Sequence, residues 1–258
     1  LGSSLKKELI SKKIECVTPD PRCDKILDDN LGHVIYAIGV PDFHKDPFKT
    51  IDAHVILLNK ILKEQNFESF LYLSSTRLYH NALSTAENSR LNVNPSYLDD
   101  LYNISKIMGE SICNMSRKSN IRIVRLSNVT GNNFDSNTFL ASIIRDAIQK
   151  KKIFLKTSLN SQKDYVYLND VIDLLPKIAI NGKHSIYNIA SGQNLTNEEL
   201  AKRIQQITKC KIQVATNAKK YEFPKISINL IKNEFNFKPT SILDKIDEII
   251  KTYQKKFQ

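Results

Sequence analysis

A tyrosine and a lysine stand four positions apart in the segment Tyr102-Asn-Ile-Ser-Lys106. Apolar residues recur around them at helical spacing, at Leu101, Ile104, Met108 and Ile112. Both side chains are therefore expected on one face of a helix, one turn apart. An ammonium group close to a phenol favours the phenolate and lowers the phenol pKa from its usual value of about 10. Tyr102 is thus a candidate acid/base for a substrate hydroxyl or ketone, although a surface tyrosine stacked on a lysine stem has the same spacing.

Small hydroxyl side chains follow an apolar segment further upstream. Residues 70–73 read as a strand that ends in Ser74, Ser75 and Thr76. Open α/β sheets bind ligands beyond the carboxyl ends of their strands, so Ser75 and Thr76 are candidate hydrogen-bond donors to a substrate. The alternative is a Ser/Thr turn that bonds its own backbone. A second strand ends similarly, in the polar segment that contains Asn128.

The elements that position these residues alternate between strand and helix. Short apolar or β-branched segments predict strands at 14–17, 33–38, 69–73, 121–126 and 185–189. Segments 48–62 and 101–112 have the apolar spacing of amphipathic helices. This alternation predicts an α/β fold with a doubly wound parallel sheet.

The second half of the chain has a looser pattern and predicts a smaller lobe. We expect a helix at 138–150, strands at 153–155 and 164–168, and a capping box from Thr196 to Glu199 that begins a helix running to residue 207. The predicted division is a domain with the main sheet over 1–130 and a smaller lobe over 131–258, with 185–190 returning to the sheet. No linker rich in proline or glycine separates them.

The composition narrows the class of protein. The 258 residues carry a net charge of +11, but the lysines are dispersed and the densest run, 150–152, fits a solvated turn, so no nucleic-acid partner is expected. We find neither an apolar stretch of membrane-spanning length nor a secretory leader, and expect a cytoplasmic protein with no membrane partner. The four cysteines are scattered without a metal-binding spacing, so no metal site is expected.

Taken in order, seven segments resemble the extended short-chain dehydrogenase/reductase family, of the NAD-dependent epimerase/dehydratase type that modifies nucleotide sugars. The matching segments are 1–5, 33–39, 73–79, 102–106, 125–131, 163–170 and 187–192. The first resembles only the end of a glycine-rich loop, so the first strand and most of that loop are absent from the sequence. We expect a longer natural chain, and the alternative is a natural short form with compromised cofactor binding. The resemblance implies a Rossmann-like fold, NAD or NADP as cofactor, a dinucleotide-binding domain over 1–130 that is N-terminally incomplete, and a mainly substrate-binding lobe over 131–258.

The resemblance also implies roles for individual residues. Tyr102 would be the acid/base, Lys106 would bind the nicotinamide ribose and lower the tyrosine pKa, and Ser75, or Thr76 in its place, would bond the reacting oxygen. Cofactor contacts would come from Gly2, Ala37, Ile38 and Gly39. Asp20 would favour NAD and Arg22 would favour NADP, so the choice stays open. Substrate contacts would come from Asn128 and Lys163, while Arg77 is either a further substrate contact or a surface residue.

The implied activity is hydride transfer on a sugar, by an epimerase or a reductase, with a nucleotide sugar for surface polysaccharide or glycan synthesis as the expected substrate. A 4,6-dehydratase is not expected, because Thr76 and Arg77 stand where that branch has an Asp-Glu pair. The resemblance implies a homodimer formed through the helices near 48–62 and 101–115, unless their apolar stripes are used up on the sheet. The alternative function is a non-catalytic dinucleotide-binding or regulatory protein of the same fold.

Overall fold

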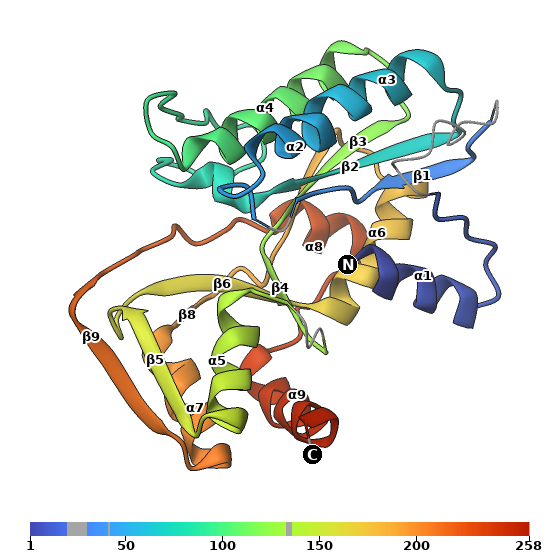
Figure 1. Cartoon of the computed structure of the whole chain (residues 1–258). Coiled ribbons are helices and arrows are strands. Elements are labelled where there is room, and N and C mark those ends of the chain that lie inside the picture. The colour runs from blue at the N-terminus through green and yellow to red at the C-terminus, as the bar shows by residue number, and fades with distance from the viewer. Residues whose placement is uncertain (20–29, 41, 133–135, 258) are drawn as a thin grey trace. The chain divides into compact units, whose positions relative to one another are not determined.

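Four strands form the main sheet, in the order β1-β2-β3-β7 (Figure 1). They are β1 (His33–Tyr36), β2 (Ser69–Ser75), β3 (Ile121–Leu126) and β7 (Ile186–Ile189), and the sheet is parallel. The computed structural model of the chain describes residues 1–19, 30–40, 42–132 and 136–257. The α/β fold predicted from the alternation of strands and helices is confirmed.

The chain divides into two units. Unit 1 comprises residues 1–78, 90–126 and 171–188, and unit 2 comprises residues 79–89, 127–170 and 189–258. Unit 1 contains the main sheet and the helices packed on it. Unit 2 contains two smaller sheets and the remaining helices.

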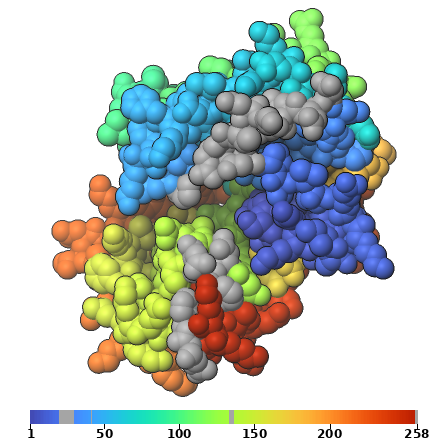
Figure 2. Space-filling view, turned by 45° about the vertical axis from the view of Figure 1, so that its right-hand side comes forward, coloured from blue at the N-terminus to red at the C-terminus, as the bar shows by residue number. Residues whose placement is uncertain are grey.

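Helices cover both faces of the sheet in unit 1, as a doubly wound arrangement requires (Figure 1). One face carries α2 (Pro47–Ile51), α3 (Leu57–Glu64) and α4 (Asp100–Met115), and the other carries α6 (Leu168–Asn181) and α1 (Gly2–Ser11). Helix α1, dark blue in Figure 2, lies at the surface and buries only Leu5. No helix in the described part of the chain is long and apolar enough to cross a bilayer.

Residues 14–17, which the sequence predicts as a strand, form none. Ile14 is 48% exposed and Val17 is 80% exposed, and no described strand pairs with them. β-Branched residues favour a strand only where they pack against neighbours on a half-buried sheet. The prediction is wrong because this segment has no such surface.

The predicted helix over 48–62 exists with one irregularity. Between α2 and α3 lies a single π-helical turn, Asp52–Ile56, which places His54 in the interior of the unit. Such a turn adds a residue to the helix and redirects the side chains that follow it, and π-turns are frequent at functional sites.

Helix α4 is fixed on the sheet by a buried ion pair. Arg125 of β3 donates from Nε and Nη2 to the two carboxylate oxygens of Glu110, at 2.9 and 2.6 Å. Both side chains are almost fully buried. A bidentate pair of this kind constrains the rotation of the helix as well as its position.

Unit 2 is built around an apolar core of its own. Strands β4 (Asn128–Thr130), β6 (Gln162–Tyr167) and β8 (Asn194–Thr196) form one sheet, and β5 (Lys152–Thr157) pairs with β9 (Lys211–Lys219). The helices are α5 (Phe139–Gln149), α7 (Asn197–Thr208), α8 (Asn229–Phe235) and α9 (Ile242–Phe257). The predicted capping box is confirmed, since Thr196 accepts from the Glu199 amide and the Glu199 carboxylate accepts from the Thr196 amide.

We predict that Glu110→Leu lowers the free energy of unfolding by about 3–5 kcal/mol, because it leaves the Arg125 guanidinium buried without its counter-charge. Urea denaturation followed by circular dichroism measures the change. The double variant Glu110→Leu/Arg125→Leu should regain most of the loss. Glu198→Ala, which breaks an exposed pair with Lys202, serves as control and should cost no more than about 1 kcal/mol. Equal losses in the first variant and the control would contradict a structural role for the buried pair.

Candidate active site

The predicted catalytic residues meet at the carboxyl end of β2. Ser75 ends the strand, and a 3-10 turn, Thr76–Tyr79, follows it directly. The Ser75 hydroxyl accepts the Arg77 backbone N–H at 3.1 Å and is hydrogen-bonded to the Tyr102 hydroxyl. Thr76 is buried beside them. The structure thus brings Ser75 and Tyr102, which are distant in sequence, into direct contact.

The Tyr102 phenol lies among aromatic and charged groups of unit 1. Its ring centroid is 5.4 Å from that of Phe43 and 5.5 Å from that of His54, with the His54 ring edge-on. Burial raises the pKa of Tyr102, while the Ser75 hydrogen bond and the charge of Arg77 lower it. Two groups of the protein therefore favour the phenolate and offset part of the cost of desolvation.

Arg77 is held over the tyrosine by a network of its own. Its guanidinium carbon lies 5.6 Å from the ring centroid of Tyr102 and 5.1 Å from that of Phe43, within the range of cation–π contacts. The guanidinium donates to the backbone carbonyl of Asp99 at 3.3 Å and lies 3.8 Å from its carboxylate. The same carboxylate lies 3.3 Å from His44 Nε2. The Arg77 guanidinium therefore lies next to the Tyr102 ring, and its role as a substrate contact stays a prediction.

Lys106 lies one turn beyond Tyr102 on α4 and is 5% exposed. Its Nζ donates to the Leu73 carbonyl at 2.8 Å and lies 5.0 Å from the ring centroid of Tyr72. Burial lowers the pKa of Lys106 to about 7, against the opposing influence of the Glu110 carboxylate. The ammonium has three N–H donors and the carbonyl takes one, so two can serve a ligand. The groups that lower the tyrosine pKa in this structure are Ser75 and Arg77.

His54 is a buried neighbour of Tyr102 that the sequence did not single out. Its Nδ1 lies 2.9 Å from Ser105 Oγ, which itself donates to the Tyr102 carbonyl at 2.8 Å. Desolvation and the charge of Lys106 lower the pKa of His54 to about 3, so the ring is neutral at ordinary pH. A β-carbon added at Gly39 would lie 3.6 Å from His54 Nε2, so the Gly39 backbone runs beside this imidazole.

The predicted cofactor-binding segments of unit 1 lie close to one another. A β-carbon added at Gly2 would lie 3.9 Å from the Ala37 β-carbon, so the start of α1 adjoins the end of β1, where Ala37, Ile38 and Gly39 follow. The first turn of α1 carries no acidic residue. A ten-residue helix with free N–H groups and no carboxylate in its first turn suits an anion such as a diphosphate. These residues fit a dinucleotide, while Asp20 and Arg22 lie outside the described residues.

The predicted substrate contacts Asn128 and Lys163 both belong to unit 2. Asn128 is exposed at the start of β4 and donates to the Asp164 carbonyl at 2.8 Å. Lys163 on β6 lies with its Nζ 5.6 Å from the ring centroid of Phe223, and the ring centroid of His80 lies 5.2 Å from the same centroid. Both side chains stay predictions as substrate contacts.

Sequence reasoning missed Phe43, His54 and Asp99. Phe43 and Asp99 come from loops, and His54 from an apolar helix in which a lone histidine is usually part of the core. A pattern could have pointed to Asp99 only through its place just before the helix of Tyr102, where an acidic residue is also a common helix start. None of the three has a local sequence signal for its contact with Arg77 or Tyr102.

Solved structures share this fold over the whole chain. MoeE5, solved with UDP-glucose and NAD, is 14% identical with a TM-score of 0.82, covering 100% of this chain and 96% of that one. TunA, an NAD-dependent NDP-hexosamine 5,6-dehydratase of tunicamycin biosynthesis, is 18% identical with a TM-score of 0.80, covering 98% and 94%. The UDP-glucose 4-epimerase of Thermotoga maritima is 16% identical with a TM-score of 0.74, covering 100% and 96%. At these identities the likeness establishes the fold.

No curated protein matches the chain by sequence. The sequence pattern of one family does match, over residues 2–190, and this span includes the main sheet, Ser75, Tyr102 and Lys106. It is more than half of the chain. The protein is therefore a member of the NAD dependent epimerase/dehydratase family.

Proposed function

We propose that the protein is an NAD- or NADP-dependent epimerase or reductase of a nucleotide sugar, with Tyr102 as its acid/base. The observation that carries the proposal is the Tyr102 hydroxyl, hydrogen-bonded to Ser75 at the carboxyl end of β2 and lying under the Arg77 guanidinium. A phenol placed in this way can exchange a proton with a sugar hydroxyl. Tyr102, Lys106 and Ser75 together provide a proton relay, for which a pure binding protein has no need.

In the oxidative direction the Tyr102 phenolate takes the proton of the reacting sugar hydroxyl. The hydrogen on the carbon that carries this hydroxyl leaves with its electron pair, and the carbon and oxygen form a carbonyl. The bound nicotinamide supplies the site that accepts and returns this hydride. Ser75 then donates a hydrogen bond to the sugar oxygen, and in the reverse direction the Tyr102 hydroxyl returns the proton. Return of the hydride to the opposite face gives an epimer, whereas net transfer gives a reduced or oxidised sugar.

The cofactor would be held by residues of unit 1. Gly2 and the first turn of α1 would bind the diphosphate, and Ala37, Ile38 and Gly39 would border the nicotinamide half. Lys106 has two N–H donors left for the nicotinamide ribose. Asn128 and Lys163 remain the predicted contacts of the nucleotide sugar, a class of ligand that the solved structure of MoeE5 contains as UDP-glucose.

The side chains after Ser75 bear on the reaction class. Elimination of water from a sugar needs an acid and a base beyond the proton relay, and neither Thr76 nor Arg77 provides a carboxylate. The carboxylate beside them, Asp99, is engaged by His44 and Arg77. This arrangement favours an epimerase or reductase over a 4,6-dehydratase.

A homodimer is part of the proposal. Helices α2 and α4 and the π-turn expose large apolar side chains: Phe48 is 84% exposed, Ile56 is 56% exposed and Met108 is 48% exposed. Some apolar side chains of these helices therefore do not pack against the sheet. Exposed apolar groups on adjacent helices are typical of protein–protein contacts.

We predict that Tyr102→Phe lowers kcat by about 10²- to 10⁴-fold without weakening cofactor binding, because it removes only the proton relay. Turnover is measured with a panel of nucleotide sugars, and cofactor affinity by calorimetry with NAD, NADH, NADP and NADPH. The control is Tyr221→Phe, which alters a partly exposed ring of unit 2. Both the chain shown and one extended by any natural residues before Leu1 are used. If neither form binds a cofactor, the enzymatic function is excluded and only a non-catalytic role is left.

We predict that Arg77→Gln raises the pKa of Tyr102, because it removes a positive charge that stabilises the phenolate. The Tyr102 resonance of protein labelled with ¹³C at the tyrosine ζ-carbon reports this pKa directly, after assignment with Tyr102→Phe. Since a folded-state phenol pKa that is raised keeps the proton on, the alkaline transition should move to higher pH. Arg77→Lys should restore part of the effect, whereas an unchanged titration in Arg77→Gln would exclude this role.

We predict that Ile56→Asp/Met108→Asp converts the dimer into a monomer, because the substitutions bury charges in the proposed interface. Light scattering after size-exclusion chromatography measures the mass. Matched changes at exposed apolar residues of unit 2, Phe154→Asp/Val214→Asp, should leave it unchanged. A monomeric wild-type protein would refute the interface.

A further inference from the structure

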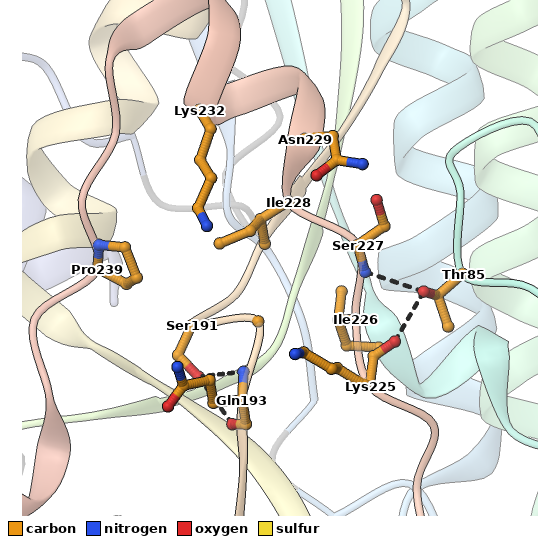
Figure 3. A pocket seen from close by; sticks show the side chains of 11 residues that line it. Thr85, Ser191, Gln193, Lys225, Ile226, Ser227, Ile228, Asn229, Lys232 and Pro239 are labelled. Atoms are coloured by element: carbon orange, nitrogen blue, oxygen red, sulfur yellow. Dashed lines mark hydrogen bonds between the residues drawn. The ribbon is translucent and has the colours of Figure 1, made fainter.

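Unit 2 contains a pocket of about 370 Å³ that no residue of the proposed reaction lines (Figure 3). Its walls come from the loop after β7, the extended segment before α8, the helix α8 itself and Thr85. The residues that line it are Thr85, Ser191, Gly192, Gln193, Lys225, Ile226, Ser227, Ile228, Asn229, Lys232 and Pro239. Its volume falls in the usual range for sites of small organic molecules.

Two lysines give the pocket its charge. Lys225 extends into it from the segment before α8, and Lys232 extends from the helix, so that the two ammonium groups point into the same space (Figure 3). Neither side chain forms an ion pair with another described residue. Among the described lining residues none is acidic. An anion in this pocket would therefore meet two positive charges without displacing a counter-charge of the protein.

The Asp164 carboxylate contacts two lining residues, Ser191 and Gln193, and its oxygens already accept hydrogen bonds from them. Asp164 is buried, and it accepts hydrogen bonds from the Ser191 amide at 2.9 Å, the Ser191 hydroxyl at 2.8 Å and the Gln193 amide at 3.1 Å. These bonds hold the loop after β7 in place. They also direct its donors toward Asp164, so the anion-binding groups of the pocket are the lysines rather than this loop.

The walls are fixed before any ligand arrives. Thr85 Oγ1 donates to the Lys225 carbonyl at 2.8 Å and accepts the Ser227 amide at 2.9 Å. Gly192 has a φ of +73°, and a β-carbon there would approach Ile228 Cδ1 to 2.9 Å. The segment that carries Lys225 and the loop opposite are thus both set by local contacts, which reduces the ordering cost of binding.

The lining also has an apolar part. Ile226 and Ile228 are buried, and Pro239 closes one side. A bare phosphate would leave this surface and most of the volume unfilled, whereas an organic molecule would cover it. A phosphate monoester carries close to two negative charges at neutral pH, which matches two ammonium groups better than a single carboxylate does.

We propose that this pocket binds a phosphorylated small molecule, with Lys225 and Lys232 on the phosphate and Ile226, Ile228 and Pro239 against its organic part. The site is distinct from the residues assigned to the reaction above. The proposal does not depend on the proposed function, and it adds a second ligand-binding site to this chain.

Calorimetry and ³¹P NMR with glucose 1-phosphate, inorganic phosphate and glucose test the proposal on the whole chain. Glucose 1-phosphate should bind more tightly than inorganic phosphate, and glucose should not bind. Lys225→Gln and Lys232→Gln should each lower the affinity for glucose 1-phosphate by about tenfold or more, the change expected for loss of one charged hydrogen bond. Equal affinity for inorganic phosphate would overturn the organic part of the proposal.

The control is Lys211→Gln/Lys251→Gln, which removes two positive charges, one more than either test variant, from exposed positions of unit 2 that do not line the pocket. It should change the affinity by less than about twofold. Tyr102→Phe and Lys163→Gln should also leave it unchanged, which separates this pocket from the proposed nucleotide-sugar site. Loss of glucose 1-phosphate binding in any of these three variants would show that the phosphate binds elsewhere and would refute the proposal. So would an unchanged NMR chemical shift of the Gly192 amide when glucose 1-phosphate is added.

Discussion

The Glu110–Arg125 ion pair sets the rotation of α4, and the candidate site depends on that rotation. Tyr102, Lys106 and Glu110 follow one another at intervals of four, so they form one stripe along the helix. Because Glu110 is locked to β3 by two hydrogen bonds, the other two side chains must point toward the sheet as well. Lys106 then reaches the Leu73 carbonyl, and Tyr102 reaches Ser75 at the end of the same strand.

Burial of this stripe disfavours the charged forms of Tyr102 and Lys106, and neighbouring groups offset part of this effect. Desolvation raises the pKa of Tyr102 and lowers the pKa of Lys106 to about 7, so it opposes both the phenolate and the ammonium. The Glu110 carboxylate counters the effect on Lys106, and Arg77 counters it on Tyr102. Arg77 can do so without full burial because Asp99 and Phe43 hold its guanidinium over the ring. Arg77, which comes from a different element than Tyr102, thus supplies a positive charge next to the phenol, and the influence of Lys106 on the tyrosine pKa stays a prediction.

The fold was predictable where a segment's own pattern decides its structure. The helix of Tyr102, the strands of the main sheet and the capping box at Thr196 follow from apolar spacing and from local hydrogen-bonding residues. Residues 14–17 have the composition of a strand but no partner surface, and composition alone cannot reveal that. The π-turn at 52–56 is also invisible in the sequence, because its residues are ordinary helix residues and only their packing decides the extra residue per turn.

The site was predictable in part for a related reason. Tyr102 and Lys106 share a helix, so their spacing predicts their common face, and Ser75 could be placed at a strand end by the apolar segment before it. Arg77, Asp99 and His54 come from three separate elements, and their meeting at Tyr102 depends on the packing of α4 and the π-turn. Since the cation that acts on Tyr102 is one of these, the ionisation of the proposed acid/base is a property of the folded unit rather than of its motif.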